Sequence, residues 1–166
     1  MSETSRHRDK FRLYTQGMGL DIGYGGAPIH DHAIAMDQVV KYADYEGKPQ
    51  HLYGTATNLY WFRDNVLDFV YSSHLIEDFV NPKFVLMEWT RVIVKGGHLC
   101  LLFPDEQHYR RLTKPEYWNL NHKHMDMGLE FMLSVVRSIP NLTMIEAGEF
   151  LSDSDYNCMI VCRKDY

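Results

Sequence analysis

The sequence predicts an α/β domain built on a mostly parallel sheet, and three observations point to this fold class. Short apolar segments alternate with helical patterns, a glycine-rich loop follows the first such segment, and a continuously apolar stretch follows the strongest helical pattern. Strands that alternate with helices pair in parallel through right-handed crossovers. The length of 166 residues suits a single domain.

The first residues differ in character from the rest. Residues 1–9 are polar and charged, so we expect a loose tail there and a domain that spans residues 10–166. The amphipathic stretch at residues 10–17 is expected to pack on that domain.

Seven apolar stretches predict strands. They are residues 18–23, 33–37, 51–56, 67–75, 98–104, 142–150 and 156–164. The third is the weakest pattern, whereas HLCLLFP at residues 98–104 is continuously apolar, which is typical of a central parallel strand covered on both faces.

Two helices are predicted after the fourth and fifth strands. Asn81 can cap the first, Pro82 suits its first turn, and Gly96 and Gly97 are expected to end it. Its apolar face consists of Val85, Trp89, Val92 and Ile93. The second helix stops at Pro140 and places on one face Met132, Val135, Val136 and Ile139. Between these helices, residues 104–128 show no period and predict a long loop.

Four segments are expected to meet at one edge of the sheet. The carboxyl ends of parallel strands lie at the same edge, which is where such sheets bind ligands. Each of these segments lies at or directly after the end of a predicted strand: the glycine loop at residues 23–26, Asp37, residues 72–74 and residues 104–108. The sequence therefore predicts a ligand site built from these segments.

The glycine loop departs from phosphate-binding patterns. From Gly23 it reads GYGGAP, so Pro28 stands where GxGxxG has its third glycine. Only about six residues separate Gly26 from the next strand, too few for a helix that holds a pyrophosphate. A nicotinamide oxidoreductase is therefore disfavoured. A nucleoside without phosphates fits better, since glycines permit close backbone approach and Asp37 could accept hydrogen bonds from two ribose hydroxyls.

The motifs LDIGYGG, AIAMD, LDFVYSSHLIEDF and LMEWTRVIVKGGHLCLLFPDE, in this order, resemble those of class I S-adenosylmethionine-dependent methyltransferases of the type 11 group. The resemblance covers residues 17–107. It implies a Rossmann-like sheet of seven strands, one of them antiparallel, with shortened early helices here, and S-adenosylmethionine as the cofactor. A net charge of -5 suits a cationic cofactor.

The resemblance also implies a cofactor site. The matching residues are Asp21, Gly23, Gly25, Asp37, Thr55, Ala56, Ser72 and His74. Asp37 matches the acid that binds ribose, and Ser72 and His74 match the segment beneath the methionine part. Thr55 stands where the family often has an acidic residue beside the adenine. Asp21 can in addition hold the loop by bonding to its backbone amides.

A hydroxyl acceptor would need a base, and histidine is suited to neutral pH. The candidate bases are His74, His108, His122 and His124, and Asp105 could orient one of them. The aromatic residues 104–128 are expected to cover the site and bind the acceptor. A weaker resemblance of PDEQHYRR and WNLNHKH to methyltransferases of surface polysaccharide and glycan biosynthesis makes a sugar hydroxyl the leading acceptor. An amine or carboxylate acceptor would need no strong base.

Other readings remain open. The missing early helices and Thr55 are also compatible with a non-catalytic, methyltransferase-like module that binds a partner. Shortened crossovers would leave apolar sheet surface for a second copy, so a homodimer is expected. The pairs His30–His32 and His122–His124 could hold a metal, but neither has a clear third ligand nearby, so no metal site is predicted.

The composition of the chain limits the partners and the cellular location that we expect for the protein. The net charge of -5 argues against nucleic acid as the main partner. No apolar stretch approaches the ~20 residues of a membrane span, and no apolar signal region is recognised. Cys100, Cys158 and Cys162 lie in apolar stretches, which indicates small core residues in a reducing cytoplasm. We therefore expect a cytoplasmic protein that acts on a small molecule.

Overall fold

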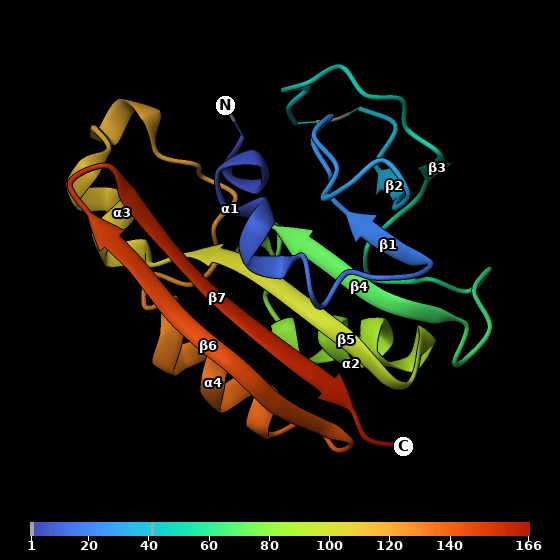
Figure 1. Ribbon diagram of the computed structural model, residues 1–166. Helices are drawn as coiled ribbons and strands as arrows, with labels where there is room; N and C mark the ends of the chain where they lie inside the picture. Colours follow the sequence, from blue (N-terminus) through green and yellow to red (C-terminus); the bar gives the residue numbers. More distant parts are fainter. Residues whose placement is uncertain (1, 41) are drawn as a thin grey trace.

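Seven strands form one sheet in the computed structural model, which describes residues 2–40 and 42–166 (Figure 1). The strands are β1 (Gly19–Ile22), β2 (Ile34–Asp37), β3 (Leu52–Tyr53), β4 (Leu67–Ser73), β5 (Ile93–Pro104), β6 (Leu142–Ser152) and β7 (Asp155–Lys164). The helices are α1 (Glu3–Phe11), α2 (Pro82–Val92), α3 (Glu106–Leu112) and α4 (Leu129–Arg137), with 3-10 turns η1 (Ile76–Asp78) and η2 (Pro115–Tyr117). Within the described residues, no helix is long and apolar enough to cross a membrane.

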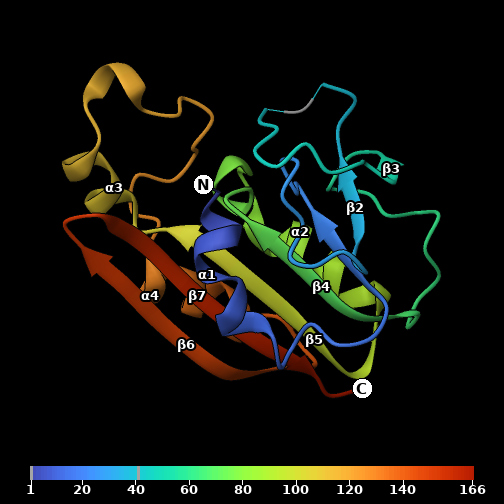
Figure 2. The same ribbon diagram turned by 45° about the horizontal axis from the view of Figure 1, so that its top comes forward.

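The order of the strands confirms the predicted fold class. They lie in the order β3-β2-β1-β4-β5-β7-β6, and β7 alone runs antiparallel to its neighbours. The carboxyl ends of β1, β2 and β4 consequently face one edge. The segments that follow β2 and α3 project beyond this same edge (Figure 2).

The two faces of the sheet are covered by different helices (Figures 1 and 2). Trp89 of α2 and Met132 of α4 are buried in the core on one face. On the other face, Phe11 of α1 and Ile29 of the β1–β2 loop pack with Tyr71 of β4. Successive side chains of a strand point to opposite faces, so β4 contributes to both cores.

The crossovers between the early strands are short, as predicted. The connections from β1 to β2, from β2 to β3 and from β3 to β4 contain no helix within the described residues. Ile29 and Ala33 of the first connection are buried against the sheet beside Phe11. Shortened crossovers were expected to leave apolar sheet surface for a second copy, but on this face α1 and the loop cover the sheet. The homodimer therefore stays a prediction without that support.

The expectation of a loose tail at residues 1–9 is wrong. Residues 3–11 form α1, whose first turn is capped by Ser2: its hydroxyl oxygen accepts a hydrogen bond from Ser5 N–H at 3.0 Å. Thr4 and His7 are buried although both are polar. A pattern of apolar residues could not predict this helix, because Phe11 is its only large apolar residue.

Helix α2 begins where the sequence predicts and ends earlier. Asn81 Oδ1 accepts a hydrogen bond from Phe84 N–H at 3.1 Å, which confirms the predicted cap. The helix stops at Val92, not at Gly96 and Gly97, because Ile93 pairs with Leu67 of β4 and begins β5. Strand pairing thus overrides the helical spacing of Ile93.

The predicted long loop at residues 104–128 contains a helix. Asp105 Oδ1 accepts a hydrogen bond from His108 N–H at 2.8 Å and caps α3. The buried residues of α3 are Glu106 and Tyr109. Since its buried face is polar and aromatic, no apolar period marked it in the sequence. The three cysteines, by contrast, are buried and free, as expected.

Candidate functional site

The loop after β1 turns at glycines and is tied to the end of β2. Gly23 and Gly25 have φ values of +72° and +53°, in the left-handed region that glycine adopts without steric penalty. Gly23 N–H donates to the carbonyl oxygen of Met36 at 2.9 Å, and Gly25 N–H donates to Asp37 Oδ2 at 3.2 Å. The two predicted cofactor-binding segments are therefore bonded to each other.

Asp21 holds this loop from within the core. Its side chain is fully buried, and Oδ2 accepts a hydrogen bond from Ile29 N–H at 2.6 Å. Oδ1 has no hydrogen-bond partner among the residues that the structure describes. Burial, with a smaller contribution from the charge of Asp37, raises the pKa of Asp21 to about 8. Asp21 does not line a cavity described below, so its place is beneath the loop and not in contact with a ligand.

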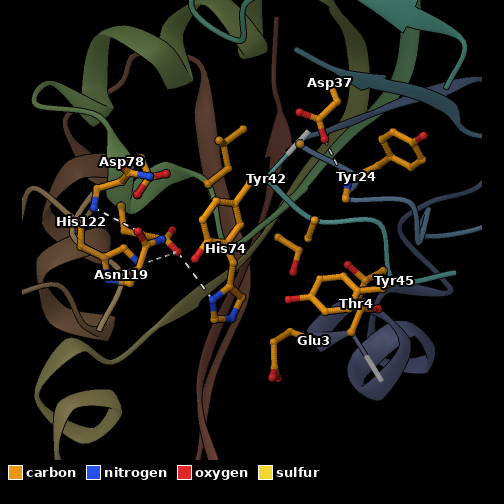
Figure 3. Close-up of a pocket in the computed structure, with 18 of the residues that line it drawn as sticks. Glu3, Thr4, Tyr24, Asp37, Tyr42, Tyr45, His74, Asp78, Asn119 and His122 are labelled. Carbon is orange, nitrogen blue, oxygen red and sulfur yellow. Dashed lines mark hydrogen bonds and ion pairs between the residues drawn. The ribbon is translucent and has the colours of Figure 1, made fainter. Parts of the chain in front are cut away.

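Two adjoining cavities lie at the carboxyl edge of the sheet. The first, of about 300 Å³, lies between α1, the glycine loop and the segment after α3. The second, of about 650 Å³, extends toward the end of β3. Gly23, Asp37 and Leu75 line both, so the two form one crevice. Figure 3 shows Asp37 and Tyr24 on one side of the first cavity, and His122 and Asp78 on the other.

Of the residues predicted to lie near the adenine or the methionine part of the cofactor, some line the crevice and one is buried in the core. Thr55 and Ala56 line the second cavity. The carbonyl oxygen of Ala56 accepts a hydrogen bond from Trp89 Nε1 at 2.7 Å, which fixes this loop on α2. Ser72 is buried, donates to the carbonyl oxygen of Ile22 at 2.9 Å and lines neither cavity. Ser72 therefore fixes the end of β1 beside the loop.

His74 lies at the first cavity in a constrained backbone conformation. Its φ is +52°, which is uncommon for a residue other than glycine. Its ring lines the cavity, and Nε2 lies 2.6 Å from Asn157 Oδ1 of β7. Burial lowers the pKa of His74 below its ordinary value, although the bond to Asn157 opposes this effect. The ring is therefore neutral at neutral pH and can accept a proton.

The partners of Asn157 decide which ring nitrogen of His74 carries the proton. Asn157 Nδ2 lies 2.8 Å from Glu3 Oε2 and 2.6 Å from Asp155 Oδ1. Only the NH₂ group of an amide can donate to two carboxylates, so Oδ1 faces His74. Oδ1 can only accept, hence Nε2 of His74 is protonated and Nδ1 keeps its lone pair. Helix α1 thereby fixes the tautomer of His74.

A second histidine lies among buried carboxyl groups. His122 lines the first cavity, and its Nδ1 is 2.7 Å from Oε2 of Glu106, whose Oε1 accepts from Arg110 Nε at 2.6 Å. Oε1 of the buried Glu77 lies 3.8 Å from His122 Nε2 and 3.6 Å from His74 Nδ1. Among residues 2–40 and 42–166 neither carboxyl oxygen of Glu77 finds a hydrogen-bond partner, and burial raises the pKa of Glu77 well above its ordinary value.

The other two candidate bases lie outside the crevice. His108 Nε2 is 2.7 Å from the carbonyl oxygen of Ser152, and His124 Nε2 is 2.9 Å from that of Phe79. Neither histidine lines the first or the second cavity. Asp105 caps α3 through the backbone of His108 and does not orient a ring at the crevice.

Several residues at the first cavity were missed by the sequence analysis. They are Glu3, Thr4, Tyr42, Tyr45, Glu77 and Tyr156, whereas Tyr109 and Asn119 belong to residues 104–128, which were expected to cover the site. The aromatic content of residues 104–128 was the available signal for Tyr109. Glu3 carried no signal, because α1 reaches the crevice through contacts with segments distant in sequence, such as the packing of Phe11 on Tyr71, with ring centroids 5.0 Å apart.

The histidine pairs considered as metal ligands lie apart from one another. The rings of His30 and His32 have centroids 5.6 Å apart, whereas His122 and His124 bind different partners. A group formed by Glu3, His7 and Asp155 has its ligand atoms within 4.8 Å of one another, but Asn157 donates hydrogen bonds to both carboxylates. The absence of a metal site stays a prediction.

The part of the chain that forms this crevice is similar to a known protein family. Residues 20–101 match a family model described as a methyltransferase domain. This range contains every predicted cofactor-binding residue, from Asp21 to His74. No curated protein matches the sequence significantly.

Solved structures share the fold over nearly the whole chain. A Thermotoga maritima SAM-dependent methyltransferase, described as a possible histamine N-methyltransferase, has a TM-score of 0.73 at 18% identity, covering 98% of this chain and 89% of its own. A SAM-dependent methyltransferase from Archaeoglobus fulgidus has a TM-score of 0.72 at 15% identity, covering 97% and 92%. A Haloferax volcanii protein solved in complex with the Trm112 methyltransferase activator has a TM-score of 0.72 at 13% identity, covering 98% and 89%. At these identities the likeness shows the fold.

Proposed function

Since this chain belongs to the class I S-adenosylmethionine-dependent methyltransferases, we propose that the crevice at Gly23 and Asp37 binds the cofactor and that the first cavity holds a small-molecule acceptor. S-adenosylmethionine is the methyl donor of this enzyme class. The observation that carries the proposal is the placement of Gly23, Asp37 and His74 around one cavity.

The residues of the crevice fit this cofactor. Asp37 receives backbone hydrogen bonds from Gly25 at 3.2 Å and Gln38 at 2.8 Å, and each carboxylate oxygen can accept a further one from a ribose hydroxyl. Gly23 and Gly25 leave room for a close approach to the backbone. Thr55 and Ala56 line the second cavity, on the side assigned to the adenine.

The charges of the crevice favour a sulfonium compound over a phosphate. Among the described residues that line the first cavity there is no lysine or arginine, and Lys123 is the basic residue that lines the second. A pyrophosphate would need several donors or a helix N-terminus, and within the described residues no helix lies between β1 and β2. When bound, the cofactor supplies a methyl group on a positively charged sulfur.

We assign to His74 the role of proton acceptor. Its Nδ1 keeps a lone pair, because Nε2 donates to Asn157 Oδ1, and its ring lines the first cavity. His122 is the second candidate at the cavity. His108 and His124 are not assigned a role in catalysis, since both bind backbone carbonyl groups outside it.

The acceptor is a small molecule enclosed by the first cavity. A sugar hydroxyl, the leading acceptor from the sequence, stays a prediction. The alternative of a non-catalytic module is not adopted, because the groups that would hold the cofactor and take the proton lie together at one cavity. A cytoplasmic location also stays a prediction, as does a homodimer, which sedimentation would test.

Calorimetry with S-adenosylmethionine and its demethylated product tests the proposal. We expect micromolar binding by the wild-type protein and at least about tenfold weaker binding by Asp37→Ala, since hydrogen bonds to a charged group are lost. Asp31→Ala is the matched control, because Asp31 is exposed and lines neither cavity. Absence of heat with both compounds in the wild-type protein would overturn the assignment.

A further inference from the structure

We infer that the acceptor carries an amine, bound in the first cavity through the carboxylate of Glu77. This inference rests on the proposed function and names the class of its substrate. It differs from the sugar hydroxyl that the sequence favours.

Glu77 is a buried acceptor without a donor. Its side chain is 1% exposed, and neither carboxyl oxygen has a hydrogen-bond partner in the described part of the chain. Two ring nitrogens lie close to Oε1, His74 Nδ1 at 3.6 Å and His122 Nε2 at 3.8 Å, both beyond ordinary hydrogen-bond distance. A carboxylate buried without donors is costly, which is why burial raises the pKa of Glu77, and an ammonium group that supplies donors there would stabilise the ionised form.

The charges around the first cavity favour a cation. The acidic residues that line it are Glu3, Asp37, Glu77 and Asp78. No lysine or arginine lies among its described lining residues, and the nearby Arg110 is paired with Glu106 at 2.6 Å. Asp37 is assigned to the ribose, and Glu3 is paired with Arg6 at 3.5 Å and accepts a hydrogen bond from Asn157 at 2.8 Å, which leaves Glu77 and Asp78 for the acceptor. A carboxylate acceptor would be repelled, whereas an ammonium group would be attracted.

Aromatic side chains complete a surface suited to an amine. Tyr42, Tyr45, Tyr109 and Tyr156 line the first cavity, and Figure 3 shows Tyr42 and Tyr45 near His74. The face of a tyrosine ring attracts a cation. A neutral sugar would also pack on tyrosine rings and donate hydroxyl hydrogen bonds to the carboxyl groups, but it would leave their negative charge unbalanced, whereas an ammonium group neutralises it. The combination of rings and negative charge therefore favours an amine over a sugar.

The distance between His74 and Glu77 suits one bound nitrogen. His74 Nδ1 and Glu77 Oε1 are 3.6 Å apart, so an ammonium nitrogen about 2.8 Å from each can contact both. The ammonium gives one proton to His74 Nδ1 and becomes a neutral amine. Its lone pair then forms the bond to the methyl carbon, and the pair of the broken carbon–sulfur bond returns to sulfur. The product is a methylated ammonium, and His74 releases its proton to solvent.

Nuclear magnetic resonance titration with propylammonium chloride tests this inference. The protein is first saturated with S-adenosylhomocysteine, whose binding is verified by calorimetry in the same sample. Propan-1-ol is the neutral probe of matched shape, and methyl α-glucoside is the sugar probe. The ring signals of His74 and His122 report occupancy of the first cavity.

We expect propylammonium to bind at least about tenfold more tightly than propan-1-ol. Glu77→Gln should remove this preference and retain the affinity for S-adenosylhomocysteine. Glutamine has the same shape and no charge to bury, so the fold should tolerate it. Glu116→Gln is the matched control, since Glu116 is exposed and does not line the cavity. Equal affinity for both propyl probes, no saturable shift with propylammonium, or tighter binding of the glucoside would overturn the inference, while failure to bind S-adenosylhomocysteine would instead overturn the proposed function.

Discussion

Asn157 Oδ1 lies 2.6 Å from His74 Nε2 and joins two residues that are 83 positions apart in the sequence. Asn157 is fully buried, and its amide also bonds to Glu3 of α1. The bond leaves Nδ1 of His74 without a proton and directs it toward Glu77 at 3.6 Å. A residue of β7 and a residue of the first helix thus set the state of a side chain that follows β4.

Replacing Asn157 should slow methyl transfer without weakening cofactor binding. In Asn157→Ala the tautomer of His74 is no longer fixed, and we expect kcat to fall about tenfold or more, as is usual when the orienting partner of a histidine is lost. The affinity for S-adenosylhomocysteine should stay unchanged. Glu149→Ala on exposed β6 is the control. A loss of cofactor affinity equal to the loss of kcat would contradict a positioning role.

Substitution of a histidine at the cavity should lower kcat, whereas substitution of a histidine outside the cavity should not. His74→Asn keeps a residue that tolerates the φ of +52° and removes the base, so we expect kcat to fall roughly 100-fold. His108→Ala should leave kcat within about twofold, because His108 bonds to Ser152 away from the cavity. Steady-state kinetics at several pH values measure both. Equal losses for the two variants would remove His74 from its assigned role.

Stability should fall with rising pH because of Asp21. Its pKa is raised from 3.8 in the unfolded chain to about 8 in the folded protein, so the folded state holds a proton that the unfolded state releases. The contribution of Asp21 to the free energy of unfolding is therefore greatest below the lower value. It should fall by about 1.4 kcal/mol per pH unit between the two values.

Asp21→Asn provides the comparison for this pH dependence. Its amide oxygen can still accept the hydrogen bond from Ile29 N–H, but the side chain does not titrate. Urea denaturation at successive pH values should give a flatter curve for this variant than for the wild-type protein. Asp31→Asn, which changes an exposed residue, should follow the wild type. Parallel curves for all three proteins would rule out this origin.

Helix α1 should contribute strongly to stability through Phe11. Phe11 is fully buried and packs on Tyr71, so Phe11→Ala should lower the free energy of unfolding by about 3–5 kcal/mol. Leu13 is 80% exposed, and Leu13→Ala should change stability by less than about 0.5 kcal/mol. Denaturant titration measures both. A small effect of Phe11→Ala would mean that α1 docks only loosely on the sheet.

Much of the fold and part of the site could be predicted from local patterns. The seven strands, the cap at Asn81 and the short early crossovers follow from apolar runs, turn residues and chain length. The position of Gly23 and Asp37 at one edge follows because parallel strands end on the same side of a sheet. The predicted end of α2 was wrong, because the pairing of Ile93 with Leu67 depends on a strand that is distant in sequence.

The candidate bases show where local patterns stop being informative. His74, His108, His122 and His124 were equivalent in sequence, since each lies near a predicted strand end or in an aromatic segment. Their surroundings separate them: two line a cavity, and two bond to backbone carbonyl groups elsewhere. Glu77 gave no signal, because its missing hydrogen bonds are a property of its packing.

The chain's local chemistry is thus enough to identify its sheet, its glycine loop and the acid that follows the second strand. These features depend on neighbouring residues and on the constant direction of parallel strands. Only the contacts of the folded chain establish that α1 reaches the crevice and that Asn157 fixes the tautomer of His74. The same contacts place the carboxyl group of Glu77 beside His74 without a hydrogen-bond donor among the described residues. Such contacts join segments far apart in sequence, and their geometry follows from sheet register and side-chain packing, which no local pattern encodes.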